Sequence, residues 1–496
     1  MIASLGIDLP TGLLLCLAVL LALSFEFVNG FHDTANAVAT VIYTHSLTPT
    51  QAVVWSGTWN LIGVLTSSGA VAFGIVALLP VELVINVGSG AGFAMVFALL
   101  ISAIIWNLGT WYLGLPASSS HTLIGSIVGV GLMNSFMSPD SAFGDGINWV
   151  KVADTVKALL ISPVVGFVAA ALLLLLAKKL LRKPELFTAP EGKKPPPAWI
   201  RGLLVFTCTG VSFAHGSNDG QKGMGLIVLI LVGIVPASFA LDLSTSSDAL
   251  HRLASQSTVI SRSLEALPGV TLTSGDSEAV HKQLTQFLRS GKDAPATWSA
   301  LASANARIGA RLAHVDDLAK LPDAERRALR LDVYLVGETL AREAKAKRLR
   351  AGLDAQQIMS YQKSLKEMTN FVPVWVKVAV ALALGLGTMI GWKRIVVTVG
   401  EKIGKAHLTY GQGASAELVA FATIEAADVL GLPVSTTHIL SSGIAGTMVA
   451  NGSGIQRETV RNIILAWVLT LPVCVALGAA LFGATLFFVF RVLGVH

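Results

Sequence analysis

Two short stretches of the chain share residues that could bind an anion. Residues 114–125 read GLPASSSHTLIG, and residues 431–442 read GLPVSTTHILSS. In each, a proline favours the start of a helix, and three hydroxyl residues follow that can cap its first turn. A helix start also offers free backbone N–H groups and the positive end of the helix dipole. Two such starts could hold one tetrahedral oxyanion between them; ordinary capping of a re-entrant helix is the alternative. The hydroxyl residues predicted to bind it are Ser118, Ser119, Ser120, Ser435, Thr436 and Thr437.

A second motif also occurs twice. GFHDTANA at 30–37 and GSNDGQKG at 216–223 share the pattern Gly-x-[His/Asn]-Asp-x-x-[Asn/Lys]-small. Each copy lies inside an apolar run, where an ionised aspartate is costly unless it is paired, hydrated or bound to an ion. An aspartate that only bonds a neighbouring helix is the alternative, and two copies in corresponding places count against it. The residues of these motifs predicted to bind substrate are Asp33, Asn36, Asn218, Asp219 and Lys222.

The first copy continues a polar face of a predicted helix. Glu26, Asn29, Asp33 and Asn36 are three or four residues apart, so they share one face. That face cannot look at lipid, and we expect it to line a cavity. Asp33, Asp219 and Glu26 are the residues that we expect to bind a coupling cation.

The second copy is rich in glycine. Four glycines fall within residues 216–225, and glycine lowers helix stability and allows unwinding. Unwound backbone at membrane depth is tolerated only where protein or water satisfies it, so we expect a broken helix near 215–220. Lys222 adds a cation beside Asp219, either as a simple ion pair or as a contact for an anion.

The elements that must position these motifs are membrane helices. Of 496 residues, 53% are apolar and 13% are charged, and the mean hydropathy is +0.67. A soluble domain has about 25% charged residues. Apolar runs of about 20 residues can cross the hydrocarbon core. We expect spans at 12–44, 52–79, 93–113, 152–177, 203–235, 374–392, 411–430 and 460–490, and shorter helices at 122–136 and 438–450. The predicted fold class is an all-α polytopic membrane protein. We expect no cleaved signal peptide, because the N-terminus lacks the basic segment that precedes the apolar run of such a peptide.

The positive charges predict which segments face the cytoplasm. Six lysines and arginines follow an apolar run between residues 178 and 194, where positive-inside signals occur. This distribution excludes a nucleic-acid surface as the reason for the net charge of +6. Residues 236–371 are polar, lean basic and have helical spacing, so we expect an inserted helical domain in the cytoplasm. If both segments are cytoplasmic, 203–235 must enter the membrane and return, and a helix broken near 215–220 would allow this.

The motifs occur in the same order in two halves, which predicts two homologous, inverted repeats with re-entrant hairpins. Internal repeats with a site at their interface are typical of secondary transporters. No P-loop and no Gly-x-Ser-x-Gly elbow occurs in the sequence, so we expect neither direct use of ATP nor an enzyme. The predicted division is 1–183 for repeat 1, 184–200 for a cytoplasmic connector, 201–235 for the first part of repeat 2, 236–371 for the inserted cytoplasmic domain and 372–496 for the remainder of repeat 2.

Several long stretches together resemble the inorganic phosphate transporter (Pit) family, most of all the low-affinity bacterial Pit permeases. They are NGFHDTANAVATVIYT, IIWNLGTWYLGLPASSSHTLIG, AHGSNDGQKG, TVGEKIG and the second Gly-Leu-Pro stretch. They occur in order over both membrane halves, whereas 236–371 carries none of them.

The resemblance implies a homodimeric symporter in the inner membrane. Its substrate would be inorganic phosphate, carried as a complex of hydrogen phosphate with a divalent metal and driven by a proton gradient, with no covalently bound cofactor. The family's ligands would fall on Asp33, Asn36, Asp219 and the two hydroxyl triplets, and Glu401 joins the cation-coupling residues. Lys222 stands where many members have asparagine, which puts the charge balance of a sodium site in doubt.

Other functions stay open at this stage. Other members of the family use sodium, and some relatives carry sulfate. A divalent-metal transporter could use His32, Asp33, His215 and Asp219 as ligands, with phosphate as a counter-ion only. A channel or a membrane scaffold is the remaining class. Glu425 and Asp428 share a helical face with Glu417 and could belong to a proton path or a hydrated vestibule.

Overall fold

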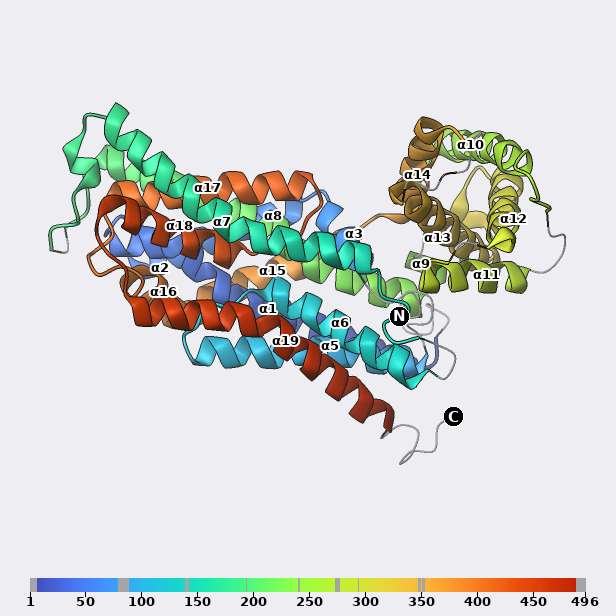
Figure 1. The fold of residues 1–496 in the computed structure, drawn as a ribbon, viewed down its shortest axis with the longest axis horizontal. Helices are drawn as coiled ribbons and strands as arrows, with labels where there is room; N and C mark the ends of the chain where they lie inside the picture. Colours follow the sequence, from blue (N-terminus) through green and yellow to red (C-terminus); the bar gives the residue numbers. More distant parts are fainter. Residues whose placement is uncertain are drawn as a thin grey trace.

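The protein is helical throughout the part of the chain that the structure describes. The computed structural model describes residues 7–78, 89–138, 142–192, 194–239, 241–272, 277–292, 294–346, 349 and 353–487, without the side chains of residues 33–36, 237 and 295. Within these ranges no strand forms. Figure 1 shows two parts: a long body of helices and a smaller group of helices at one end of it.

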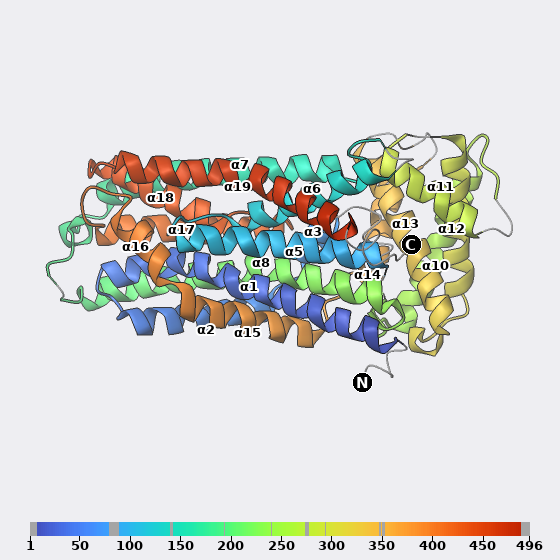
Figure 2. The same cartoon turned by 90° about the horizontal axis from the view of Figure 1, so that it is seen from below.

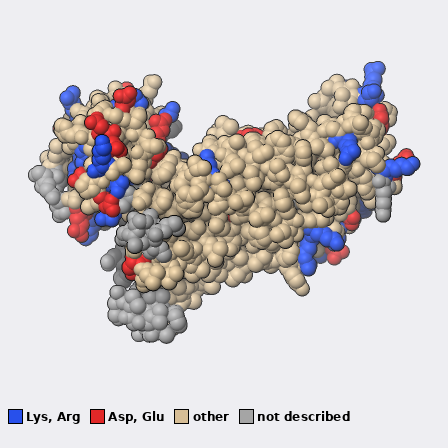
Figure 3. All heavy atoms as spheres, turned by 180° about the vertical axis from the view of Figure 1, so that it is seen from behind, with Lys and Arg blue, Asp and Glu red and all other residues tan. Residues whose placement is uncertain are grey.

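The body contains the predicted membrane helices. Its elements are α1 (Leu9–Tyr43), α2 (Pro49–Thr66), α3 (Ala70–Val76), α5 (Gly90–Tyr112), α6 (Ser119–Met137), α7 (Trp149–Leu180), α8 (Ala198–Ile234), α15 (Val374–Gly391), α16 (Lys393–Glu401), α17 (Tyr410–Val429), α18 (Thr436–Asn451) and α19 (Arg457–Phe487). By length and composition, five of the described helices can cross a membrane, namely α1, α5, α7, α15 and α19. Figure 3 agrees, because the charged residues on the face it shows gather toward the two ends and leave a largely uncharged middle.

One expected span is broken. The run 52–79 was predicted as a single span, but α2 and α3 are separate helices bent by 75°. Ser67 ends α2 in an extended conformation, and Gly69 starts α3 with a φ of +86°. Glycine adopts this left-handed conformation without the steric cost that other residues have. The pair therefore counts as one broken span or a re-entrant loop.

Helix α8 is continuous through the region where we expected a break. It runs for 37 residues, about 55 Å at 1.5 Å per residue, which exceeds the ~30 Å of hydrocarbon. The glycines of 216–225 serve close packing instead of unwinding. A Cβ on Gly216 would lie 2.1 Å from the carbonyl oxygen of Asn60, and one on Gly225 would lie 2.5 Å from that of Ala72. The predicted break near 215–220 is wrong, because these glycines let α2 and α3 approach the α8 backbone.

The continuous course of α8 also bears on the predicted sidedness. The connector 184–200 and the inserted segment leave α8 at its two ends, and Figures 1 and 2 show them at opposite ends of the body. A helix that crosses the membrane once has its ends on opposite sides. If α8 crosses the membrane once, the two segments lie on opposite sides. The cytoplasmic placement of both stays a prediction, because α8 is not among the five described helices that can cross a membrane by length and composition.

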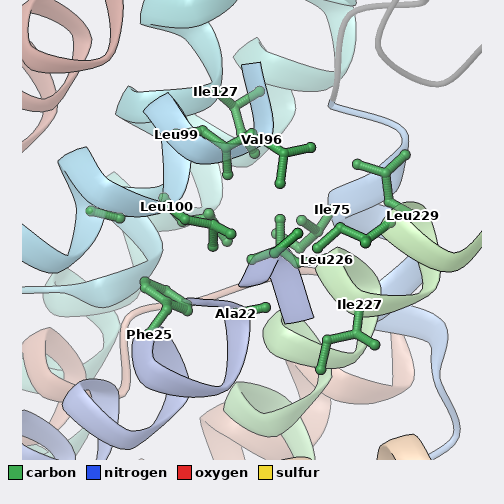
Figure 4. Packing of buried hydrophobic residues seen from close by; sticks show 14 of the residues in the cluster. Ala22, Phe25, Ile75, Val96, Leu99, Leu100, Ile127, Leu226, Ile227 and Leu229 are labelled. Carbon is green, nitrogen blue, oxygen red and sulfur yellow. The ribbon is translucent and has the colours of Figure 1, made fainter. Parts of the chain in front are cut away.

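The core of the body joins helices that are distant in the sequence. Figure 4 shows Phe25 of α1, Leu99 and Leu100 of α5, Ile127 of α6 and Leu226 of α8 directed toward a common interior. All five are buried. This packing fixes α1, α5, α6 and α8 relative to one another, and these helices carry most of the predicted site.

Residues 236–371 form a helical unit with a core of its own. Its elements are α9 (Pro236–Phe239), α10 (Ser247–Glu265), α11 (Ser277–Ser290), α12 (Pro295–Leu312), α13 (Asp323–Lys345) and α14 (Ala355–Thr369). Trp298, Phe287 and Tyr361 are at most 1% exposed inside it. An ion pair between Lys345 and Asp154 joins it to α7 of the body.

A buried carboxylate organises this inserted domain. Asp332 is 1% exposed and pairs with Arg307 at 2.5 Å, with Arg311 at 2.7 Å and with His281 at 2.7 Å. Burial alone would raise the pKa of Asp332, but hydrogen bonds from His281 and Arg307 hold it below its ordinary value. The charge therefore stabilises the domain fully above the ordinary pKa of an aspartate, and this effect is lost as the pH falls through the lowered pKa.

Replacing Asp332 with asparagine leaves the two arginines without their shared anion. Breaking a buried pair costs ~3–5 kcal/mol, and we expect about 2 kcal/mol here because the arginines are partly exposed. Hydrogen exchange of the full-length protein in detergent, read on peptides of α12 and α13, should show faster exchange. Asp316→Asn is the control, since Asp316 is exposed and pairs with His251. Equal exchange in both variants would show that the cluster around Asp332 does not hold the domain together.

Candidate functional site

Both Gly-Leu-Pro stretches form the predicted helix starts. Gly114 and Gly431 take φ values of +68° and +63°, just after the ends of α5 and α17. The proline two residues later cannot continue the preceding helix, so the chain turns there. Ser118 caps α6 by accepting the N–H of His121 at 3.2 Å, and Ser435 caps α18 by accepting the N–H of His438 at 3.2 Å. The prediction of capped helix starts is confirmed.

The two helix starts meet inside the body. Ser120 Oγ donates to the carbonyl oxygen of Val434 at 2.7 Å. The imidazole rings of His121 and His438 lie 4.7 Å apart, and His438 stacks on Trp467 at 4.0 Å. These contacts hold the tip of each hairpin against the other, and all six hydroxyl residues of the triplets are at most 3% exposed. Helix dipoles and first-turn N–H groups of two helices thus converge on one buried region.

An ion pair of α8 lies beside these helix starts. Lys222 Nζ is 2.6 Å from Asp219 Oδ2, and the two side chains are 0% and 1% exposed. Ser119 Oγ lies 3.5 Å from Asp219 Oδ2 and 3.5 Å from Lys222 Nζ. These are long distances for hydrogen bonds, so the Ser119 hydroxyl is held loosely between the two charges. Ser119 of the α6 start therefore reaches both members of the pair.

Several buried polar atoms of α1, α5 and α8 have no hydrogen-bond partner among the described side chains. They are Glu26 Oε1, Asn29 Oδ1, Asn107 Nδ2, Asn218 Oδ1 and Asp219 Oδ1. Buried polar groups are normally paired, so a group of unpaired ones marks a place where a ligand can bind. Glu26 and the α8 backbone are in close contact, because a Cβ on Gly223 would lie 2.2 Å from Glu26 Cγ.

The other predicted site residues are placed as follows. The α1 backbone at Asp33 and Asn36 is helical, but their side chains lie outside the described part of the chain. Asn218 donates to Leu432 O at 3.3 Å and is buried, whereas Glu401 is exposed at the end of α16. The structure therefore does not bring Glu401 to the helix starts.

The two histidines predicted as metal ligands form hydrogen bonds with different residues. His32 Nε2 lies 2.7 Å from Asn107 O, and His215 Nδ1 lies 2.8 Å from Asn60 Oδ1. Within the described ranges, no three His, Cys, Asp or Glu side chains gather as a metal site. His215 does approach Asp219, with Nε2 3.5 Å from Oδ2.

A second buried carboxylate network was not foreseen from the sequence. Asp428 accepts hydrogen bonds from Ser217 at 2.8 Å and from Gln221 at 2.6 Å, while Gln221 Oε1 accepts the N–H of Val71 at 2.8 Å. The network ties α17, α8 and α3 together next to Asp219. The sequence signal was the acidic face of α17, which gave no indication of the partners.

Glu417 is another buried carboxylate of the body. It accepts hydrogen bonds from Thr40 of α1 and Thr207 of α8 and is 0% exposed. Glu26 lies near Gly223, and Thr40 and Thr207 meet at Glu417, so α1 and α8 run antiparallel.

The body can cross a membrane, and inside it lie buried charges and two helix starts that face each other. This architecture is that of a membrane transporter. The profile of the phosphate transporter family matches residues 29–478, and the chain belongs to this family. Its relatives include the low-affinity inorganic phosphate transporters PitA and PitB of Escherichia coli K12. PitA is 42% identical over 97% of this chain and 99% of its own length, and PitB is 41% identical over 97% and 98%.

A solved structure shares the fold. It is described as "The sodium-dependent phosphate transporter" and aligns with a TM-score of 0.50 at 19% identity, over 95% of this chain and 98% of that one. The family and these relatives are transporters, so the prediction that the chain is not an enzyme is confirmed.

The contact between Gly223 and Glu26 gives a test of this packing. We expect Gly223→Ala to force α1 and α8 apart, and overpacking of this kind costs about 1–3 kcal/mol. Thermal unfolding of the purified protein in detergent should occur at a lower temperature. Gly202→Ala is the matched control on the same helix, because nothing lies within 4 Å of a Cβ there. If both variants melt together with the wild type, Glu26 does not lie against α8 as described.

Proposed function

We propose that the protein is a secondary active symporter that imports inorganic phosphate across the inner membrane. The substrate is a complex of hydrogen phosphate with a divalent metal, and a proton gradient drives its uptake. The observation that carries the proposal is the meeting of two capped helix starts beside the Asp219–Lys222 pair, with Ser119 between them. Family membership and the names of the PitA and PitB relatives support phosphate as the substrate.

Phosphate would be held by groups that each provide a partial or full positive charge. Its oxygens would accept hydrogen bonds from Ser119, from first-turn N–H groups and from Lys222. Two helix starts contribute roughly +0.5 charge each, so a site with a neutral Asp219–Lys222 pair suits an anion of low charge. Charge-assisted hydrogen bonds of this kind are strong but allow release, because no bidentate arginine clamp is among them.

Competition for Lys222 would couple the anion to a cation. When a phosphate oxygen takes the Lys222 ammonium, Asp219 loses its partner and becomes an uncompensated buried charge. Such a charge is unfavourable, and a proton or the substrate's own metal ion relieves it. Glu26 and Asn29 on α1 have unpaired oxygens that could receive the same cation. With anion and cation both bound, the site would carry less net charge than the separate ions and side chains do.

The two halves of the body would supply the moving parts. We propose that they are inverted repeats, which the antiparallel course of α1 and α8 supports. Each half supplies one capped hairpin, and Ser120 and Val434 join the two at the site. A rocking motion of one half against the other would open the site to each side in turn. We also propose that the protein is a homodimer, as the family resemblance implies.

The alternatives differ in the coupling cation or in the ion that is transported. A sodium-coupled symporter is supported by the name of the related solved structure, a sodium-dependent phosphate transporter. Lys222 counts against it, because its ammonium is already 2.6 Å from Asp219 and balances that charge without sodium. A divalent-metal transporter, or a transporter of sulfate, has the same architecture and is separated by the experiments below.

Uptake of labelled phosphate tests the site itself. In cells that lack other phosphate importers, Ser119→Ala should lower the uptake efficiency about 10-fold, the effect of one lost hydrogen bond to a charged group. Asp219→Asn should abolish accumulation, because it removes the carboxylate that accepts the cation. Ser126→Ala is the matched control on the same helix, since the Ser126 hydroxyl donates to Thr122 O of its own backbone. Uptake like the wild type in both Ser119→Ala and Asp219→Asn would refute the proposal.

Proteoliposomes test the coupling ion. With sodium absent and divalent metal present, an inward proton gradient should drive phosphate accumulation, and removing the metal should stop it. Accumulation that requires sodium would replace proton coupling by sodium coupling. Phosphate flux that never exceeds equilibration under either gradient would indicate a channel. Metal uptake without any need for phosphate would support the divalent-metal transporter, and labelled sulfate in place of phosphate tests the sulfate transporter.

A further inference from the structure

A large cavity separates the inserted domain from the body. Its volume is about 1020 Å³. The body contributes α3, the start of α7 and residues 429–431 after α17, and the inserted domain contributes α13 and α14. The Lys345–Asp154 ion pair bridges the two parts at this cavity. Pockets of about 300–1,000 Å³ hold whole organic ligands, so this one has room for a small ion with its water.

The walls of the cavity are strongly cationic. One acidic residue, Glu338, faces five basic ones among the lining residues. Burial raises the pKa of Glu338, against the opposing charges of Lys366 and Lys151, which favours its neutral form. The five basic residues are Lys151, Arg330, Arg342, Lys345 and Lys366. Arg330 lies over the ring of Tyr334 and Arg342 over that of Phe287, so both guanidinium groups are held in place.

The floor of the cavity, formed by Gly74 and Gly431, is joined by hydrogen bonds to α8, which carries part of the candidate site. Gly74 of α3 approaches Gly431 so closely that a Cβ would lie 2.8 Å from the Gly431 carbonyl oxygen. Under this contact, Gln221 binds the N–H groups of Val71 and Ala72 and donates to Asp428. Gln221 lies between Asp219 and Lys222 in the sequence, so its hydrogen bonds join α3 at the cavity to the segment of α8 that carries the ion pair.

The charges at the opposite end indicate which side the cavity faces. The connector end carries Lys178, Lys179, Arg182, Lys183 and Arg201, and Lys178 and Arg201 bond Asn451 and Ser46 there. Short loops rich in lysine and arginine face the cytoplasm, whereas long inserted domains cross largely regardless of their charge. The connector end therefore faces inward, and the inserted domain with its cavity faces outward.

We propose that this cavity is an anion vestibule in which the inserted domain and α7 collect phosphate before it passes α3 to the ion pair. The proposal rests on the proposed import of phosphate. A cleft lined by one sign of charge concentrates ions of the opposite sign and raises their rate of entry. The inserted domain would thereby have a role in transport, although it contributes no group to the helix starts.

The variant Lys151→Gln/Lys366→Gln tests the vestibule. At about 0.01 M salt, where charges act over roughly 30 Å, we expect the phosphate concentration for half-maximal uptake to rise about 3- to 10-fold. At about 0.3 M salt, with osmolarity balanced by sucrose, the difference from the wild type should nearly vanish. Lys151→Glu/Lys366→Glu should shift it further in the same direction. The maximal rate at saturating phosphate shows that each variant is folded.

A matched control removes two cations elsewhere on the same domain. Arg262→Gln/Lys282→Gln changes residues outside the cavity and should behave like the wild type at both salt concentrations. A membrane-impermeant maleimide should modify the variant Lys363→Cys in intact cells, since the Lys363 side chain is 81% exposed on the inserted domain.

The outcomes separate the two proposals. If the wild type takes up phosphate but the lysine variants show no shift at low salt, the vestibule is refuted and the proposed import stands. A shift that does not depend on salt also overturns the vestibule, as does a Lys363→Cys variant that stays unlabelled in intact cells. Absence of phosphate uptake by the wild type refutes the import itself.

Discussion

The buried ion pair between Asp219 and Lys222 constrains the rest of the structure. Two charges with at most 1% exposure can exist at this depth only because they are 2.6 Å apart. An α-helix places residues i and i+3 on one face, so the pair needs α8 to be continuous here. The same continuity sets Ser119 against both charges and lets Gly223 admit Glu26. A break in α8 at this point would separate all of these contacts.

In the proposed mechanism, the pair would let the protein bind an anion without trapping it. The Lys222 ammonium is shared: it already has Asp219, and an entering oxyanion must compete for it. Binding would therefore leave Asp219 in need of a cation, and release of the cation would restore the pair. Under this proposal, anion and cation cross together because each removes the charge imbalance that the other would create. The vestibule would add to this by raising the concentration of phosphate at the floor formed by Gly74 and Gly431.

Much of the fold was predictable because membrane helices have strong local signals. Hydropathy located the helices, and the Gly-Leu-Pro stretches correctly predicted Ser118 and Ser435 as helix caps, since capping depends on neighbours in the sequence. A glycine-rich stretch, in contrast, does not indicate one particular local structure. It permits both unwinding and close backbone contact, and the contact of Gly216 with Asn60 is decided by a helix more than 150 residues away. The sequence pattern therefore led to a break that α8 does not have.

The long-range partners of single carboxylates could not be predicted from the sequence either. Asp428 is satisfied by Ser217 and Gln221, which lie over 200 residues earlier, and no local pattern indicates such a pairing. Glu401 was assigned to cation coupling through the family resemblance, but α16 ends with it exposed. Ser119 was predicted as one of six hydroxyl residues that bind an anion; its 3.5 Å distance from Asp219 Oδ2 depends on how α6 packs on α8, which no local signature indicates.

The central claim is that phosphate binds where the two helix starts meet the Asp219–Lys222 pair. The most direct measurement is a cryo-electron microscopy map of the purified protein with saturating phosphate, compared with one in phosphate-free buffer. The account predicts tetrahedral density within hydrogen-bond distance of Ser119 Oγ and Lys222 Nζ, with Lys222 drawn away from Asp219. Phosphate density at another place in the body, with the ion pair unchanged, would contradict it.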